Sequence, residues 1–246
     1  MTTRPILAIN GTEELLQVVI GTDTTLLFCS GINGPGRTMR HLLPMIDEGL
    51  SRLGLNLADC RGIACTRGPG SFTGIRVVLA TIEGMSRASG VPIAGLDYLP
   101  LLAGDLMAHW HGEAWVLTYA RKNQVYMQGF SMPETTPLGP ARACSHDQAA
   151  DMLCARPGKV LVGGSGITKN QTFFNARLAS SAIHMAQRDV LSSHALLSAA
   201  CKEDFTRESI PPLYLRASDA EDNLAAIARK RGISLDDARQ RIPSQE

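Results

Sequence analysis

Residues 67–76 read Arg-Gly-Pro-Gly-Ser-Phe-Thr-Gly-Ile-Arg, the stretch that most constrains how this chain folds. An apolar, strand-like run at 62–66 precedes it, and an apolar, helix-like run at 75–88 follows it. Three glycines, a proline and two hydroxyl residues within positions 68–74 predict a tight turn from a strand into a helix. Backbone N–H groups are exposed in such a turn, in front of a helix N-terminus. The stretch therefore indicates an α/β protein.

Two interpretations of this turn are open. In the structural one, the glycines allow the backbone to turn, and Ser71 or Thr73 caps the following helix. In the other, the exposed N–H groups bind an anion and Arg67 or Arg76 closes over it. The candidate residues of the signature turn are Gly68, Pro69, Gly70, Ser71, Thr73, Gly74 and Arg76.

The first 108 residues predict a mixed sheet with helices on both faces. Three antiparallel strands come first, and two right-handed crossovers then add parallel strands. The expected strands are residues 6–9, 15–20, 24–29, 62–66 and 91–94, and the expected helices are 38–53, 75–88 and 98–108.

The second half looks like a reduced copy of the first, which suggests duplication although no repeat is visible at the residue level. The expected strands are 114–119, 124–130 and 160–162, followed by an extended segment at 211–216, and the expected helices are 147–154, 168–178 and 190–202. We therefore predict a first domain at 1–108, a smaller second domain at 109–216 and a charged helical tail at 217–246.

Composition describes an ordinary water-soluble protein. Hydrophobic residues make up 44% of the 246-residue chain, and the net charge of +1 favours neither nucleic acid nor an anionic membrane. The six cysteines form no CxxC pair and several lie in apolar runs, so we expect reduced, mostly buried thiols. The first residues show no secretory signal pattern, and no apolar run approaches the roughly 18 residues that span a bilayer. We expect a cytoplasmic protein without membrane contact.

Five stretches, in the right order, resemble the TsaB (YeaZ) family. Residues 6–9 look like its first strand, 42–46 like its first helix and 68–76 like its signature. Residues 120–126 resemble the start of its second domain, and 212–216 its closing strand. The resemblance covers residues 4–216 and leaves the tail outside.

The resemblance implies a fold and a role. The family has two related α/β domains of the actin-like and sugar-kinase-like (ASKHA) fold. Its members are non-catalytic scaffold subunits of the bacterial machinery that makes threonylcarbamoyladenosine in tRNA. They pair with a TsaD-like catalytic subunit, which a TsaE-like ATPase joins. Contact with tRNA would be indirect, and a homodimer stays open.

Two departures from the family argue against independent catalysis. Asn10 stands at the end of the first strand, and Tyr119 precedes Ala120-Arg121, where the family usually has aspartates. Neutral side chains supply no charge for a hard cation. An independent ATPase or small-molecule kinase is therefore disfavoured. The same departures leave a divergent glycoprotease-like paralogue open. We expect no cofactor, although a nucleotide at the junction with the partner is a further option.

The sequence also lacks the residues that a peptidase needs. The six histidines show no i, i+4 pair with a nearby glutamate, and His109 and His111 form only a close pair around a tryptophan. Residues 163–166 fail the GxSxG pattern because Ile167 replaces its last glycine. We therefore predict neither a catalytic residue nor a metal site.

The helix after the turn has two patterned sides. Apolar residues from Ile75 onward form a stripe for the sheet, and Ala80, Gly84 and Ala88 form a row of small residues. Small residues let another helix approach closely. The row either packs within the monomer or, together with Met45 and Gly49 of the first helix, forms an interface. The resemblance implies a TsaD-like partner, or a second copy, on that interface.

Overall fold

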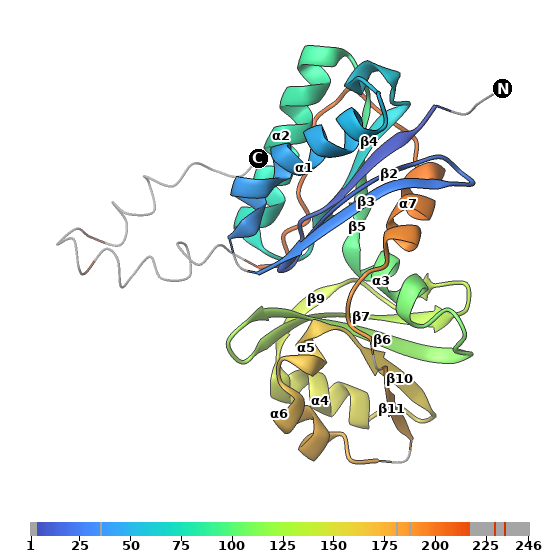
Figure 1. Ribbon diagram of the computed structural model, residues 1–246. Coiled ribbons are helices and arrows are strands. Elements are labelled where there is room, and N and C mark those ends of the chain that lie inside the picture. Colours follow the sequence, from blue (N-terminus) through green and yellow to red (C-terminus); the bar gives the residue numbers. More distant parts are fainter. Residues whose placement is uncertain are drawn as a thin grey trace.

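The computed structural model describes residues 4–34, 36–180, 182–186, 188–216, 229 and 234. It contains two mixed β-sheets, one above the other in Figure 1, each flanked by helices. The first sheet has five strands in the order β3-β2-β1-β4-β5. These strands are β1 (Ile6–Asn10), β2 (Leu15–Gly21), β3 (Leu26–Asn33), β4 (Gly62–Gly68) and β5 (Ile93–Asp97).

The first sheet has the predicted topology. Strands β1, β2 and β3 pair antiparallel, whereas β4 and β5 add parallel to β1. Every residue of β1 is buried, as its almost wholly apolar sequence indicates for a central strand. Helices α1 (Arg37–Arg52) and α2 (Phe72–Ser89) cover one face, and α3 (Tyr98–Leu106) and α7 (Ser193–Lys202) lie on the other. A short 3₁₀ turn, Leu57–Asp59, precedes β4.

The second sheet repeats this plan. Its order is β11-β10-β6-β7-β8, with β9 also paired to β7. Strand β7 runs antiparallel to β6, whereas β10 and β11 continue parallel to it. The strands are β6 (Gly112–Arg121), β7 (Gln124–Met132), β8 (Thr136–Pro137), β9 (Arg142–Ser145), β10 (Val160–Gly163) and β11 (Ile183–Met185). Helices α4 (His146–Cys154), α5 (Ser165–Thr168) and α6 (Gln171–Arg177) complete this half. The predicted fold class of two related ASKHA-type domains is confirmed.

Several element predictions were wrong in detail. Strands β8, β9 and β11 are only two to four residues long and were not predicted, because so short a run shows no usable alternation. The expected helix at 168–178 is split into α5 and α6. The closing strand that the resemblance implies at 212–216 is irregular, because Pro212 offers no N–H to a ladder. Only the Leu213 amide reaches the sheet end, at the Arg67 carbonyl oxygen, 2.8 Å away.

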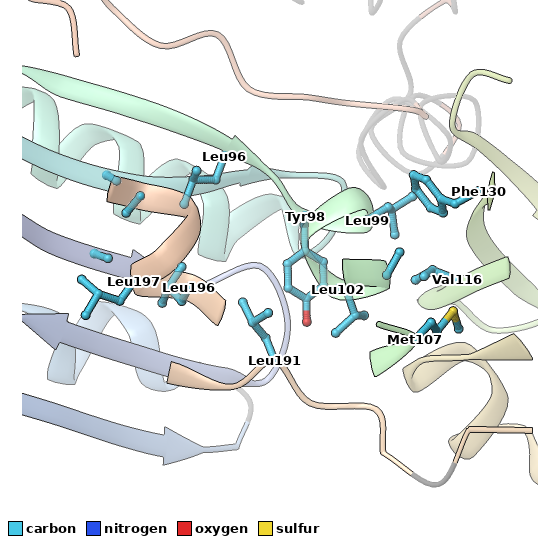
Figure 2. Close-up of a cluster of buried hydrophobic side chains, with 14 of the residues drawn as sticks. Leu96, Tyr98, Leu99, Leu102, Met107, Val116, Phe130, Leu191, Leu196 and Leu197 are labelled. Carbon is cyan, nitrogen blue, oxygen red and sulfur yellow. The ribbon is translucent and has the colours of Figure 1, made fainter. Parts of the chain in front are cut away.

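A shared hydrophobic core joins the two sheets. Figure 2 shows Tyr98, Leu99 and Leu102 of α3 between Leu196 and Leu197 on one side and Val116 and Phe130 on the other. Leu99 and Leu102 are fully buried. Removing apolar area from water stabilises a protein by about 25 cal/mol per Å². This buried layer therefore helps to hold the two halves together.

The chain returns to the first sheet before its described part ends. Helix α7 packs on β1 and β2, and residue Thr206 pairs with Ile93 of β5 through two backbone hydrogen bonds. The sequence analysis assigned α7 and Thr206 to the second domain, 109–216, whereas in the structure they pack on the first sheet. The division at residue 108 stays a prediction. The predicted helical tail at 217–246 lies outside the described residues, apart from Arg229 and Ser234.

Cysteine burial follows the sequence only in part. Cys60, Cys65 and Cys144 are buried, but Cys29 and Cys154 are exposed. Burial raises the pKa of the Cys60 thiol to about 11 and that of Cys65 to about 12. These two thiols therefore stay protonated and unreactive at neutral pH.

Candidate functional site

The signature turn joins β4 to α2 and packs against the loop that follows β1. A Cβ atom on Gly70 would lie 2.2 Å from the Thr12 carbonyl oxygen, and one on Gly74 would lie 2.3 Å from the Gly11 carbonyl oxygen. Gly68 has φ +118°, a conformation that side chains disfavour, and the Gly68–Pro69 peptide bond is cis. The glycines are required by this close approach of two backbones.

Ser71 is the N-cap of α2. Its hydroxyl accepts a hydrogen bond from the Gly74 amide at 3.2 Å, and its own amide donates to the Thr12 carbonyl oxygen at 2.7 Å. Thr73 is exposed and plays no part in this cap. Two N–H groups of the turn are thus already used inside the protein. This geometry supports the structural interpretation of the turn.

Neither candidate arginine closes over the turn. Arg67 pairs with Asp97, with 2.6 Å between Nε and Oδ1. Arg76 donates from Nε to the Tyr214 hydroxyl at 3.0 Å, and its guanidinium lies 3.8 Å from the Phe72 ring centroid. The Phe72 and Tyr214 rings are themselves stacked at 4.5 Å. Both arginines therefore bind neighbouring segments of the protein. Neither of them supplies the cation that the anion-binding interpretation of the turn requires.

A cleft of about 420 Å³ lies between the two halves. The signature turn and Met39 of α1 contribute to one wall. The opposite wall includes Tyr119, Lys169 and Arg216. A second cavity, of about 380 Å³, shares Glu13, Glu14 and Lys169 with the first. These three residues thus line both cavities.

Asn10 is held in a buried polar network. Its amide donates to Gln17 Oε1 at 2.9 Å, and its Oδ1 accepts from the Thr66 hydroxyl at 2.9 Å and the Thr12 amide at 3.2 Å. Gln17 in turn donates to the Leu191 carbonyl oxygen at 2.9 Å. Because its donor and acceptor are both engaged by the protein, Asn10 acts structurally at the strand end.

Tyr119, at the end of β6, lies beside the ammonium group of Lys169. The Lys169 ammonium lies 4.9 Å from the Tyr119 ring centroid and 2.8 Å from Glu14 Oε1. The Lys169–Glu14 pair crosses the cleft, because Lys169 follows α5 and Glu14 lies in the β1–β2 loop. Tyr119 therefore supplies an aromatic surface for this cation where the family pattern has a carboxylate.

Glu13 is the functional residue that sequence reasoning missed. Its carboxylate accepts from the Tyr98 hydroxyl at 2.7 Å and also from the Ser165 hydroxyl of the opposite wall. Ser165 accepts in turn from the Tyr119 amide at 2.9 Å. Burial raises the Glu13 pKa above its ordinary 4.5, although both hydrogen bonds and Lys169 lower it. The sequence signal was available, since Glu13 and Glu14 lie in the loop directly after the first buried strand.

The other candidate chemistries gain nothing from the described residues. In that part of the chain, no three His, Cys, Asp or Glu side chains are grouped so that they could hold a metal ion. His146 packs against Phe173 and Phe174, and its burial lowers its pKa from 6.5.

The small-residue row of α2 is on the surface. Ala80, Gly84 and Ala88 are all exposed, and a Cβ atom on Gly84 would meet nothing within 4 Å. The exposure of this row contradicts the interpretation that it packs within the described part of the monomer. Gly84 lowers the helix propensity of α2 by about 1 kcal/mol relative to Ala. No contact inside the described chain compensates that cost.

The interface assignment of Met45 and Gly49 needs correction. Met45 is only 5% exposed and sits in the core beneath α1, and a Cβ on Gly49 would lie 2.8 Å from the Phe28 ring. Their helix positions point inward with Leu42 and Ile46. The outward residues of α1 are instead Met39, 73% exposed, and Leu43, 59% exposed. We define the helical face as Met39, Leu43, Ala80, Gly84 and Ala88.

Fold and site together define a class. The chain is a two-domain α/β protein of actin-like topology whose cleft is bridged by its own side chains and whose first domain carries an exposed helical face. A family model described as "TsaD: tRNA N6-adenosine threonylcarbamoyltransferase" matches residues 37–193, more than half of the chain. The chain belongs to this family.

Its curated relatives include TsaB proteins, which confirms the resemblance to TsaB (YeaZ). The chain is 27% identical to the tRNA threonylcarbamoyladenosine biosynthesis protein TsaB of Haemophilus influenzae over 72% of its own length and 79% of that protein. It is 31% identical to TsaB of Escherichia coli over 52% of its length and spans little more than half, 56%, of that relative.

A solved structure shows the same fold. YeaZ from Pseudomonas aeruginosa superposes with a TM-score of 0.70 at 20% identity, covering 87% of this chain and all of that one. A second structure from that organism, described as similar to peptidase YEAZ, gives a TM-score of 0.71 at 21% identity over the same shares. Among the described residues, no helix has the length and apolar character needed to cross a bilayer.

Proposed function

We propose that this chain is a scaffold subunit in the biosynthesis of threonylcarbamoyladenosine in tRNA. It acts by pairing with a TsaD-like catalytic subunit through the helical face. The exposure of that face is the observation that carries the proposal. The names of the curated relatives support the pathway, because they describe TsaB as a biosynthesis protein for this modified nucleoside.

The helical face suits another pair of helices. Its α2 row consists of Ala80, Gly84 and Ala88, which let a second helix approach within about 8 Å. Met39 and Leu43 of the neighbouring helix α1 add exposed apolar side chains, and burying each contributes about 1.5–3 kcal/mol. A helical face of this kind fits a partner that presents helices of its own. A second copy of this chain would compete for the same surface.

The cleft supports a non-catalytic role in such a complex. Asn10 and Tyr119 bring no carboxylate to the strand ends, and Glu13 and Glu14 are engaged with the opposite wall. The TsaE-like ATPase would join the pair, and tRNA would be bound through the catalytic subunit. An independent ATPase or kinase of the same fold is the alternative function, because the cleft between the two halves has a volume of about 420 Å³.

Arginine substitutions test the pairing. We expect Gly84→Arg and Ala80→Arg to abolish co-purification with the TsaD-like subunit of the same organism, because a guanidinium would stand where a helix must approach. Gly158→Arg is the matched control, since a Cβ on Gly158 also meets nothing within 4 Å but the residue lies in the second half.

Reconstitution tests the function. We expect formation of the modified nucleoside by the TsaD-like and TsaE-like proteins to require this chain, and the Gly84→Arg variant not to replace it. Full pairing by both face variants would overturn the assignment of the interface. ATP turnover by the isolated protein would favour the alternative function.

A further inference from the structure

We propose that Glu13 and Glu14 form a two-point latch that holds the cleft closed by gripping Ser165 and Lys169 on its opposite wall. The latch is defined as these four residues. It is a conformational device of this chain alone and does not depend on the proposed partner.

The two contacts have a common geometry. Glu13 and Glu14 are neighbours in the β1–β2 loop of the first half. Ser165 and Lys169 lie four positions apart around one turn of α5 and its C-cap, so they share one side of that turn. The Ser165 hydroxyl donates to Glu13 Oε1, and the Lys169 ammonium lies 2.8 Å from Glu14 Oε1. Two adjacent side chains thus bind one turn on the facing domain.

Each anchor is fixed on its own side. Tyr98 of α3 donates to the other Glu13 oxygen at 2.7 Å, which orients the carboxylate toward Ser165. Ser165 is only 6% exposed, and its oxygen accepts from the Tyr119 amide at the end of β6. Lys169 is positioned over the Tyr119 ring. These supports orient both contacts before the cleft closes.

The latch separates the two cavities. Glu13, Glu14 and Lys169 line both the cavity of about 420 Å³ and that of about 380 Å³. Moving the β1–β2 loop away from α5 would join them into a single open cleft. The same loop accepts the Ser71 amide at Thr12, so it also touches the N-terminus of α2. An open latch therefore changes both the cleft and the support of the signature turn.

Charged and polar groups of both walls surround Glu13. Glu13 faces Lys169, whose charge favours the carboxylate, and Asp189, whose charge opposes it, and it also hydrogen-bonds with Tyr98 and Ser165. Thr168 donates to Asp189 beside it. Burial outweighs the favourable contacts and raises the pKa of the Glu13 carboxyl above its ordinary value.

Two native cysteines report the state of the latch. Cys29 lies on β3 in the first half and Cys154 ends α4 in the second, and both thiols are exposed. Spin labels on this pair, in a Cys201→Ser background, measure the separation of the halves by pulsed electron resonance. We expect one narrow distance distribution in the parent protein. The double variant Glu13→Ala, Glu14→Ala is expected to give a broader distribution centred at longer distance.

A matched control and a second test variant complete the experiment. Glu48→Ala removes a carboxylate of α1 whose contact is the surface pair with Arg52, and it should leave the distribution unchanged. Lys169→Met breaks one contact on a partly exposed side chain, so it keeps the test available if the double variant misfolds. It should raise amide exchange in residues 11–14 about tenfold. A parent-like distribution in the folded double variant, or unchanged exchange in Lys169→Met, would overturn the latch.

Discussion

Single residues decide where the charge of this cleft lies. The sequence has Asn10 and Tyr119 at the strand ends, and neither side chain supplies a charge for a hard cation. The structure places carboxylates one loop further on, at Glu13 and Glu14. The apolar run at 6–9 predicted β1 correctly, because a continuous apolar run is typical of a central strand that is buried on both faces. It could not show which of the next residues turn back into the cleft, since that depends on the path of the loop across α2.

Glu13 should make stability depend on pH with a definite sign. Its raised pKa means that the folded state holds a proton more tightly than the unfolded chain does. The resulting stabilisation is fully present below pH 4.5 and is lost as pH rises through the folded-state pKa. We expect the free energy of unfolding of the parent protein, relative to that of Glu13→Gln, to fall as pH rises above 4.5.

Urea unfolding at several pH values measures this difference. Glu203, whose pKa is also raised by burial, is present in both proteins and cancels. A difference that stays constant across the range would show that Glu13 does not titrate as the site requires.

At the scale of elements, the two halves share one packing arrangement. In the first half, glycines of the β4–α2 turn pack against carbonyl oxygens of the loop after β1. In the second half, Gly164 and Gly166 after β10 pack in the same way against the Leu117 carbonyl oxygen of β6, with Cβ positions 2.4 and 2.9 Å away. The repeat is invisible in the sequence because it conserves backbone proximity rather than residue order. The predicted strand order followed from element sequence alone.

Two glycines of the first half should respond in opposite directions to alanine. Gly70→Ala places a methyl group on the Thr12 carbonyl oxygen and should cost about 1–3 kcal/mol of stability. Gly84→Ala adds a methyl group into open space within a helix and should stabilise by about 0.5–1 kcal/mol. Urea midpoints of both variants check this. Equal effects would contradict the assignment of one glycine to close packing and the other to the surface.

At the scale of the whole molecule, the first sheet is completed by residues from the end of the described chain. Helix α7 covers one face of β1 and β2, and Thr206 extends the edge at β5. Nothing in the composition of 193–206 marks this return, because an amphipathic helix suits either sheet. Long-range placement of this kind was beyond the sequence.

A fragment of residues 1–108 should not fold alone. Without α7, the face of β1 and β2 that carries Ile6, Ala8 and Val19 is open to water. We expect the fragment to aggregate or to unfold without a cooperative transition in circular dichroism, and co-expression with residues 109–216 to rescue it. Cooperative unfolding of the isolated fragment would show that α7 is dispensable.

The return of α7 to the first sheet also determines when that sheet can be completed during synthesis. A ribosome adding about 5–20 residues per second needs roughly 5–20 s to pass from the end of α3 to the end of α7. Throughout that interval the part of the sheet's apolar face that α7 covers, over β1 and β2, is open to water. The second half therefore has time to finish before the half that carries the helical face is complete. Chaperones that bind exposed apolar surface are expected to act on this chain in that window.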